Sequence, residues 1–126
     1  MANTYRDLTA WQKAFALSLD VYRSTRSFPK SEVYGLAAQM QRAAVSIPSN
    51  IAEGFGRRTT PDFLRSLYIA YGSLCELETR SMLAGELGYV PREAGGSLLQ
   101  SAGDVERLTK AFIRSLEKKR SQFWHT

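Results

Sequence analysis

The last stretch of the chain concentrates basic side chains, whose chemistry is the binding of phosphate and other anions. Glu117 is the single acidic residue from position 107 onward, and the other eleven basic and eleven acidic residues cancel, so the whole net charge of +5 lies here. A local basic excess attracts a phosphate backbone. The alternative is that these residues only complement a helix dipole and keep the protein soluble. The six basic residues are Arg107, Lys110, Arg114, Lys118, Lys119 and Arg120.

A second basic pair, Arg57 and Arg58, lies in a turn just before the start of a predicted helix. Backbone amides at a helix N-terminus bind anions, so this pair is a candidate second contact for phosphate. Asp62 already occupies the positive end of that helix, which favours the alternative of a plain surface turn. The nearby Gly54 and Gly56 fit neither a P-loop nor a dinucleotide-binding pattern.

Side chains that usually carry out catalysis are scarce. The one histidine, His125, is one residue from the end of the chain, which argues against histidine-based triads and the Glu-x-x-His pairs of di-iron bundles. The one cysteine, Cys75, falls in an apolar row, which is typical of a small core residue. We therefore expect no catalytic residue, no metal site, no cofactor and no enzymatic activity.

Four polar residues are expected to form a network inside the fold. Glu78 falls near a buried row, and Asn50 and Glu53 flank the apolar Ile51. In a helical bundle such a network more often sets packing register than catalyses a reaction. The alternative, an enzyme, requires a pocket that contains Glu53 or Glu78 with a perturbed pKa. The predicted network comprises Arg42, Asn50, Glu53 and Glu78.

Apolar residues recur every three or four positions along almost the whole chain, which is the period of one helix face. This pattern predicts four helices with short connections. The third helix, at about 27 residues and ~40 Å, is expected to be the longest. The helices are predicted to start at Asp7 or Thr9, at Ser31, at Thr60 and at Pro91, and the first three to end before Pro29, at Gly54 and at Leu87.

Two residues in the second helix predict breaks in it. Pro48 has no amide hydrogen and its ring clashes with the Ala44 carbonyl, which predicts a kink or a restart with Ser46 as the new N-cap. Gly54 is expected to supply the left-handed residue that ends many helices.

The first and third helices each carry two neighbouring apolar rows. A bundle core uses one row, so the surplus predicts a subunit interface. The alternative is that neighbours within the chain cover both rows. On the first helix the rows are Leu8, Trp11, Phe15, Leu19 and Tyr22, and beside them Ala14, Leu17 and Val21. On the fourth helix the buried row is predicted at Leu98, Ala102, Val105, Leu108, Phe112 and Leu116.

These elements predict an all-α fold, an up-down antiparallel four-helix bundle in a single domain over residues 1–126. A solenoid of two helical hairpins is the alternative, and the absence of an internal repeat disfavours it. No apolar run approaches the roughly 18 residues of a membrane span, and the N-terminus lacks the apolar core of a signal peptide. We expect a cytoplasmic protein that does not bind membranes.

One segment, QMQRAAVSIPSNIAEG at positions 39–54, resembles the signature of a family of small four-helix-bundle proteins. The family takes its name from proteins encoded in intervening sequences of bacterial large-subunit ribosomal RNA genes, and was once counted among ribosomal proteins. The resemblance extends over about residues 5–90. Matching flanks lie at 7–8, 11–14, 28–29, 34–36 and 72–78.

The resemblance implies a cytosolic, non-enzymatic bundle that assembles as a ring-shaped homopentamer. The family also resembles the accessory protein of diversity-generating retroelements, a pentameric barrel that binds nucleic acid through a basic surface. We therefore expect low-specificity binding of RNA or DNA by an oligomer, with Phe123 and Trp124 as candidate base-stacking residues. The alternative is a module for protein assembly that binds no nucleic acid.

Overall fold

The computed structural model describes the backbone of residues 2–125 and the side chains of residues 2–120. Within this part of the chain every regular element is helical. Two short 3-10 turns accompany four α-helices. The elements are η1 (Tyr5–Asp7), α1 (Thr9–Thr25), η2 (Lys30–Glu32), α2 (Leu36–Phe55), α3 (Thr60–Glu86) and α4 (Arg92–His125).

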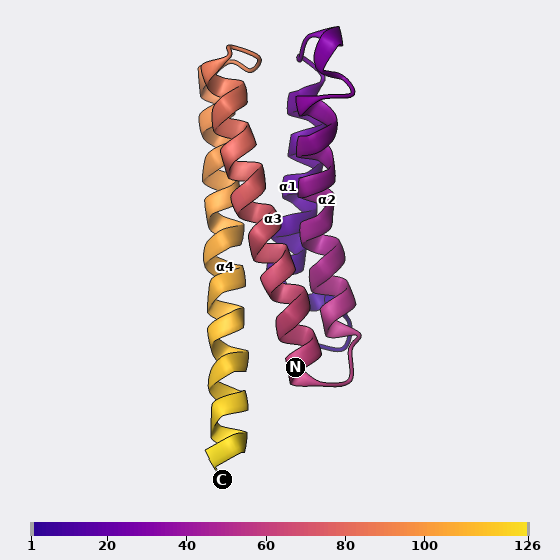
Figure 1. The fold of residues 1–126 in the computed structure, drawn as a ribbon, viewed down its shortest axis with the longest axis vertical. Coiled ribbons are helices and arrows are strands. Elements are labelled where there is room, and N and C mark those ends of the chain that lie inside the picture. Colours follow the sequence, from indigo (N-terminus) through magenta and orange to yellow (C-terminus); the bar gives the residue numbers. More distant parts are fainter. Residues whose placement is uncertain (1, 126) are drawn as a thin grey trace.

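The four helices form an up-down antiparallel bundle, as predicted (Figure 1). Contacts join α1 to α2, α2 to α3, α3 to α4 and α4 back to α1, so that α1 and α3 lie on a diagonal. The return contact between α4 and α1 closes a single bundle and rules out the two-hairpin solenoid. Among the described residues, none of the helices has the length and hydrophobicity needed to cross a lipid bilayer.

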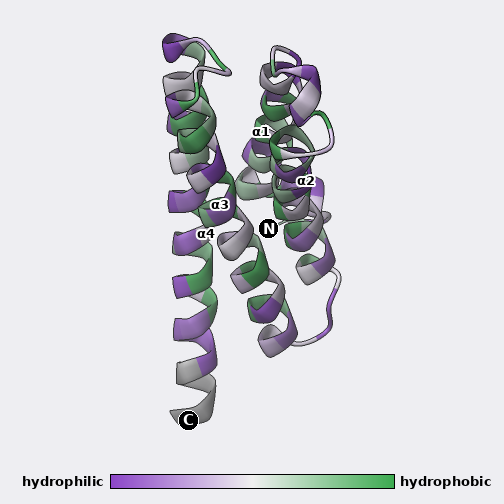
Figure 2. Cartoon of the chain, turned by 45° about the horizontal axis from the view of Figure 1, so that its top comes forward, coloured by the Kyte–Doolittle hydropathy of each residue, from purple (hydrophilic) through white to green (hydrophobic). Residues whose placement is uncertain are grey.

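The core is built from the helix faces that meet inside the bundle. Figure 2 shows hydrophobic residues on the inner side of α4 and hydrophilic residues on its outer side. The buried line of α4 contains Thr109 and Ile113, whereas the predicted Leu108 and Phe112 are only half-buried. The largest fully buried side chains are Leu17, Val21, Met40, Ile47, Ile51, Leu64, Leu67, Leu74, Leu77, Val105 and Thr109.

The predicted N-caps of the first helix are wrong. The N-cap residue of α1 is Leu8, which makes no side-chain cap, and Thr9 is already helical. Asp7 instead accepts hydrogen bonds from the amides of Asn3 at 3.0 Å and Thr4 at 3.2 Å. Its carboxylate therefore caps the short 3-10 turn and not α1.

The predicted start of the second helix at Ser31 is also wrong. Ser31 lies within η2, and α2 begins at Leu36 after Gly35. The carboxylate of Glu32 accepts a hydrogen bond from the Leu36 amide at 3.2 Å. An acidic side chain four residues upstream therefore replaces the expected hydroxyl cap.

Helix α2 passes through Pro48 without interruption, and the predicted restart at Ser46 does not occur. Because Pro48 has no amide hydrogen, the Ala44 carbonyl loses its regular helical donor. The Ser18 hydroxyl of α1 donates a hydrogen bond to that carbonyl at 3.0 Å. Ser46 does not act as a cap and instead shares a 2.8 Å hydrogen bond with Ser73 of α3.

Gly54 is a buried residue of α2 and not its left-handed end. A β-carbon at this position would lie 2.7 Å from Phe63 Cδ1 and 2.9 Å from Ser66 Cβ. Glycine is therefore needed here so that α2 and α3 can pack closely. Among the described residues, a positive φ occurs only at Gly88, just after α3.

Helix α3 runs over 27 residues, close to the prediction, but Thr59 and not Thr60 is its N-cap. The Thr59 hydroxyl accepts a hydrogen bond from the Asp62 amide at 3.3 Å. At 34 residues α4 is longer than α3, so α3 is not the longest element. Figure 1 shows that α4 continues past the start of α3.

Candidate nucleic-acid interface

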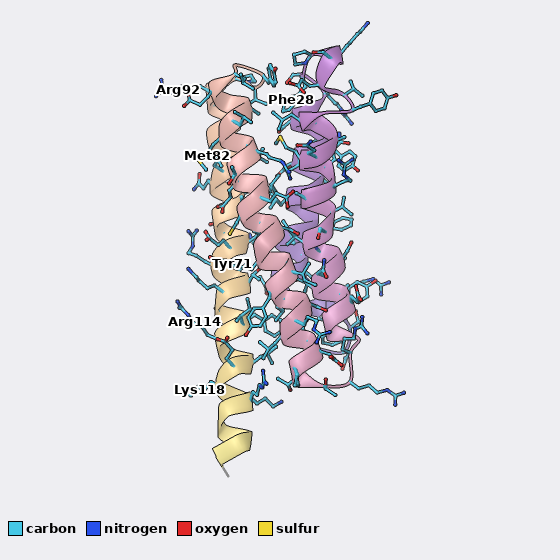
Figure 3. The ribbon with its side chains drawn as sticks, in the orientation of Figure 1. Phe28, Tyr71, Met82, Arg92, Arg114 and Lys118 are labelled. Atoms are coloured by element: carbon cyan, nitrogen blue, oxygen red, sulfur yellow. The ribbon has the colours of Figure 1, made fainter. Side chains whose placement is uncertain are left out.

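Four of the predicted basic residues lie on one side of α4, which we call the basic face: Arg107, Lys110, Arg114 and Lys118. Their spacing of three, four and four residues follows the helical period, and all four are exposed. The opposite side of α4 packs into the core through Val105 and Ile113. Figure 3 shows Arg114 and Lys118 on the side of α4 that faces away from α3.

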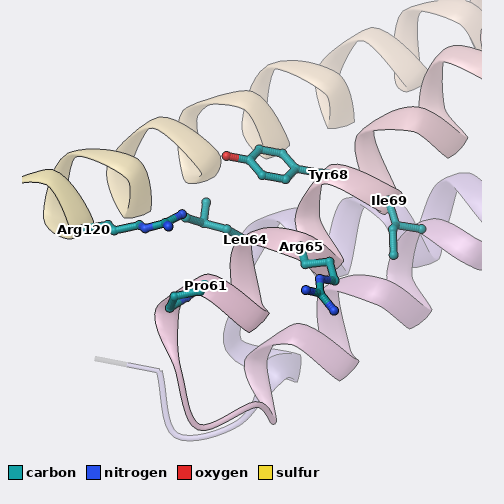
Figure 4. A pocket seen from close by; sticks show the side chains of 6 residues that line it. All are labelled: Pro61, Leu64, Arg65, Tyr68, Ile69 and Arg120. Atoms are coloured by element: carbon teal, nitrogen blue, oxygen red, sulfur yellow. The ribbon is translucent and has the colours of Figure 1, made fainter.

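Lys119 and Arg120 are exposed but do not extend the basic face in a straight line. Successive residues of an α-helix are turned by about 100°, so these two point in other directions from Lys118. Arg120 is directed toward the start of α3 (Figure 4). The structure thus separates the six predicted basic residues into a line of four and a pair on other sides of the helix.

The cations of the basic face have few partners. Arg107 forms an ion pair with Asp104, one turn before it, and 72% of its side chain is exposed. A pair this exposed contributes little stability and can be exchanged for a phosphate contact. Lys110 Nζ lies 5.8 Å from the centre of the Tyr71 ring. Among residues 2–120, neither Arg114 nor Lys118 forms an ion pair.

Carboxylates line the edge of α4 that meets α3. Glu106 accepts a 3.2 Å hydrogen bond from the Tyr71 hydroxyl, and Glu117 accepts one of 2.6 Å from the Tyr68 hydroxyl. The bond to Glu117, together with burial and its negative charge, raises the pKa of Tyr68. Burial, and then repulsion by Glu106, raise the pKa of the half-buried Glu78. These groups confine the positive surface to the outer side of α4.

The second predicted pair, Arg57 and Arg58, is exposed in the turn between α2 and α3. Arg57 forms a 2.5 Å ion pair with Glu53, and about half of each side chain is exposed, so the pair is weak. The turn lies at the end of the bundle from which α4 projects (Figure 1). The structure therefore brings Arg57 and Arg58 to the same end of the molecule as Lys118 and Arg120.

The predicted interior polar network does not form. Asn50 donates a 2.8 Å hydrogen bond to the carbonyl of Ser46 on its own helix, and Glu53 pairs with Arg57. Glu78 lies beside Glu106, and Arg42 is exposed. The four proposed members, Arg42, Asn50, Glu53 and Glu78, therefore do not join in one network.

Other predicted chemical groups are placed as follows. Cys75 is exposed on α3 and is not the core residue that its apolar row suggested. Within the described part of the chain, no three side chains of metal-ligand type come together. The side chains of Phe123, Trp124 and His125 lie outside the described residues.

The surplus apolar row of α1 is exposed in the single chain, so neighbours within the chain do not cover both rows. Trp11 and Phe15 stack with ring centres 5.1 Å apart, and Phe15 is 48% exposed. We call this surface the aromatic face, formed by Trp11, Phe15, Leu19 and Tyr22 of α1 and Val45 of α2. Leu19, Tyr22 and Val45 are 43%, 47% and 41% exposed. A single chain rarely leaves such a continuous apolar surface open to water without a binding role.

Comparison with known proteins finds a matching family profile and a solved structure of similar fold. Residues 6–111 match the family profile described as 23S rRNA-intervening sequence protein. The chain is also similar to a crystal structure of a protein with unknown function from the S23 ribosomal protein family of Bacteroides thetaiotaomicron VPI-5482. The identity is 21% over 83% of this chain and 95% of that chain, with a TM-score of 0.77. None of the curated proteins compared matches the chain.

Proposed function

Because the chain belongs to the 23S rRNA-intervening sequence protein family, we propose that it is a non-enzymatic, self-associating bundle of the cytoplasm that binds RNA or DNA. Binding occurs through the basic face of α4 and depends on phosphate contacts. The observation that carries this proposal is the exposure of four aligned cations on one side of α4, the side opposite the core. Arg57 and Arg58 are secondary contacts.

The dimensions of the basic face suit a nucleic-acid backbone. At 1.5 Å per residue, Arg107 and Lys118 are about 16 Å apart along the helix axis. Phosphates follow one another at roughly 3.4 Å along the axis of one strand of a duplex, so the face spans about five of them. Lysine and arginine contacts to phosphate carry no sequence information by themselves. The proposed binding is therefore of low specificity.

Self-association is the second part of the proposal, and it is supported by the aromatic face. Packing Phe15, Leu19 and Tyr22 against another copy would remove their half-exposed side chains from water. Each additional copy also adds a basic face, and five copies, the number that the family resemblance implies, would carry about +25. Assembly would therefore strengthen the attraction for nucleic acid.

A binding titration against salt concentration tests the phosphate contacts. The double variant Arg114→Gln, Lys118→Gln removes two cations of the basic face, and Lys13→Gln, Arg26→Gln removes two exposed cations at α1 as a matched control. The slope of log Kobs against log salt should fall by about 1.4–1.8 in the first variant only, because each phosphate contact contributes roughly 0.7–0.9.

Two results would contradict this part of the proposal. If neither RNA nor DNA is retained at low salt, the protein is an assembly module without nucleic-acid binding. If the control variant lowers the slope as much as the α4 variant does, the attraction comes from net charge and not from the basic face.

Light scattering tests the self-association. Phe15→Asp should lower the particle mass while circular dichroism shows a folded helical protein, because nearly half of this side chain is exposed. Tyr34→Asp, at a loop residue that is 94% exposed, should leave the mass unchanged. A wild-type protein that is monomeric at micromolar concentration would exclude the assembly.

A further inference from the structure

A groove at the end of the bundle lies between the first turns of α3 and the projecting end of α4. It encloses about 480 Å³ and is open to solvent. Figure 4 shows Tyr68 directed from α3 toward α4, and Arg120 directed from α4 toward the start of α3. The groove is lined by Pro61, Leu64, Arg65, Tyr68, Ile69 and Arg120.

The groove exists because the two helices differ in length. Pro61, Arg65 and Tyr68 are spaced four and three residues apart, so they share one side of α3. Opposite them, α4 continues beyond the start of α3 (Figure 1), and its Arg120 is directed toward the start of α3 (Figure 4). Arg120 follows Lys118 of the basic face by two residues, which is about 200° around α4, so the groove is a separate surface at the same end of the bundle as Lys118.

Tyr68 offers an aromatic surface inside the groove. Its side chain is 47% exposed, and its hydroxyl is held by the 2.6 Å hydrogen bond to Glu117. Ile69, which is 50% exposed, adds apolar surface to the groove, whereas the lining residue Leu64 is a buried core residue. A ring that is anchored at its polar end and open along its body can stack on a planar base, because every nucleic-acid base has a π-face.

Two guanidinium groups accompany this ring. Arg65 and Arg120 are both exposed, and within residues 2–120 neither forms an ion pair. Guanidinium groups bind phosphate oxygens through paired hydrogen bonds. The carboxylate of Glu117 already accepts the hydrogen bond that the Tyr68 hydroxyl donates. The groove thus combines a stacking surface with two phosphate ligands.

We propose that this groove binds a nucleotide of single-stranded nucleic acid, with the base stacked on Tyr68 and the neighbouring phosphates on Arg65 and Arg120. The inference rests on the proposed function and adds to it a preference for unpaired strands. A duplex keeps its bases stacked on one another, so it binds the basic face but cannot place a base on the Tyr68 ring.

Fluorescence anisotropy with labelled 20-nucleotide RNA and DNA, each as single strand and as duplex, tests the proposal. Tyr68→Ala should weaken binding of the single strands by roughly 5- to 150-fold, because stacking on one aromatic side chain is worth about 1–3 kcal/mol per base. Duplex binding should not change. Tyr68→Phe keeps the ring and should retain most single-strand binding. Tyr34→Ala is the matched control, because this exposed tyrosine belongs to the turn before α2, and that turn lies at the opposite end of the bundle (Figure 1).

The outcomes separate this inference from the proposed function. If wild-type protein binds both forms and Tyr68→Ala leaves single-strand binding intact, or weakens single strands and duplexes equally, the groove proposal is wrong and the basic face stands. If Tyr68→Ala lowers the particle mass in light scattering, the ring belongs to a subunit contact, and the groove proposal is again wrong. If no form binds wild-type protein, both proposals fail. If Tyr68→Ala weakens binding of single-stranded RNA and single-stranded DNA equally, the groove recognises the base and phosphate and not the sugar.

Discussion

The hydrogen bond between Ser18 and the Ala44 carbonyl makes a sharp prediction about how α2 tolerates a proline. Pro48 removes the amide that would serve this carbonyl, and the Ser18 hydroxyl donates to it from α1 at 3.0 Å. Ser18→Ala should therefore destabilise the protein by leaving a partly buried carbonyl without a donor. The loss is expected to be about 1–2 kcal/mol, within the range measured for unsatisfied buried polar groups.

A second substitution tests the reason for this loss. Pro48→Ala returns an amide to the Ala44 carbonyl, so in that background Ser18→Ala should cost less than about 0.5 kcal/mol. The coupling energy between positions 18 and 48 is then about 1 kcal/mol. Pro48→Ala by itself gains up to ~3 kcal/mol of helix propensity but loses roughly two buried carbon atoms at ~0.8 kcal/mol each, for a net gain near 1 kcal/mol.

Urea unfolding of the wild type, the two single variants and the double variant, followed by circular dichroism, gives the four free energies of the cycle. All four proteins are compared at one concentration, because the proposed self-association would add to apparent stability. An equal cost of Ser18→Ala in both backgrounds would refute the reasoning. The hydroxyl would then act through its 3.1 Å contact with the Ala14 carbonyl, which Pro48 does not affect.

Two further predictions concern packing and pH. Gly54→Ala should destabilise the protein in urea unfolding by about 1–3 kcal/mol, since the new methyl group would lie 2.7 Å from Phe63. Gly72→Ala should stabilise it by about 0.5–1 kcal/mol, because alanine has the higher helix propensity and its methyl group would meet nothing within 4 Å. Equal effects at the two glycines would contradict the close packing of α2 and α3. Glu78→Gln should raise the melting temperature at pH 7. The raised pKa of Glu78 means that the folded protein binds the Glu78 proton more tightly than the unfolded chain does. Wild-type stability therefore falls as pH rises through the interval between the unfolded and folded pKa values. The gain should disappear below the unfolded value of about pH 4.3, and a gain that is the same at pH 3 and pH 7 would exclude this explanation.

Much of the architecture and half of the candidate site follow from spacing along the chain. The three- and four-residue recurrence of apolar positions predicted four helices. The spacing of Arg107, Lys110, Arg114 and Lys118 follows the same period, which accounts for their position on one line of α4. These predictions depend on neighbours within two helical turns, and local geometry determines them. The surplus row on α1, with Phe15 at its centre, was predicted from the same period.

The predictions were wrong where a residue could bind more than one partner. Asp7 and Ser31 have the chemistry of N-caps, but Asp7 caps the 3-10 turn and Ser31 lies inside another. Pro48 favours a break, yet a hydroxyl from α1 replaces its missing donor. The predicted network of Arg42, Asn50, Glu53 and Glu78 does not form for a related reason. Residue type indicates which groups can bind each other, but not whether they face each other in the fold.

The sequence by itself determined which side chains share a helix face, since backbone geometry repeats every 3.6 residues whatever the surroundings. The tertiary structure decided which of those faces is covered and what lies across from it. Tyr68 and Arg120 illustrate the difference. They are 52 positions apart, and only the antiparallel packing of α3 against a longer α4 brings them to one groove. No periodic pattern in the sequence predicts that these two residues meet, because their meeting depends on where each helix ends and on how α3 and α4 pack.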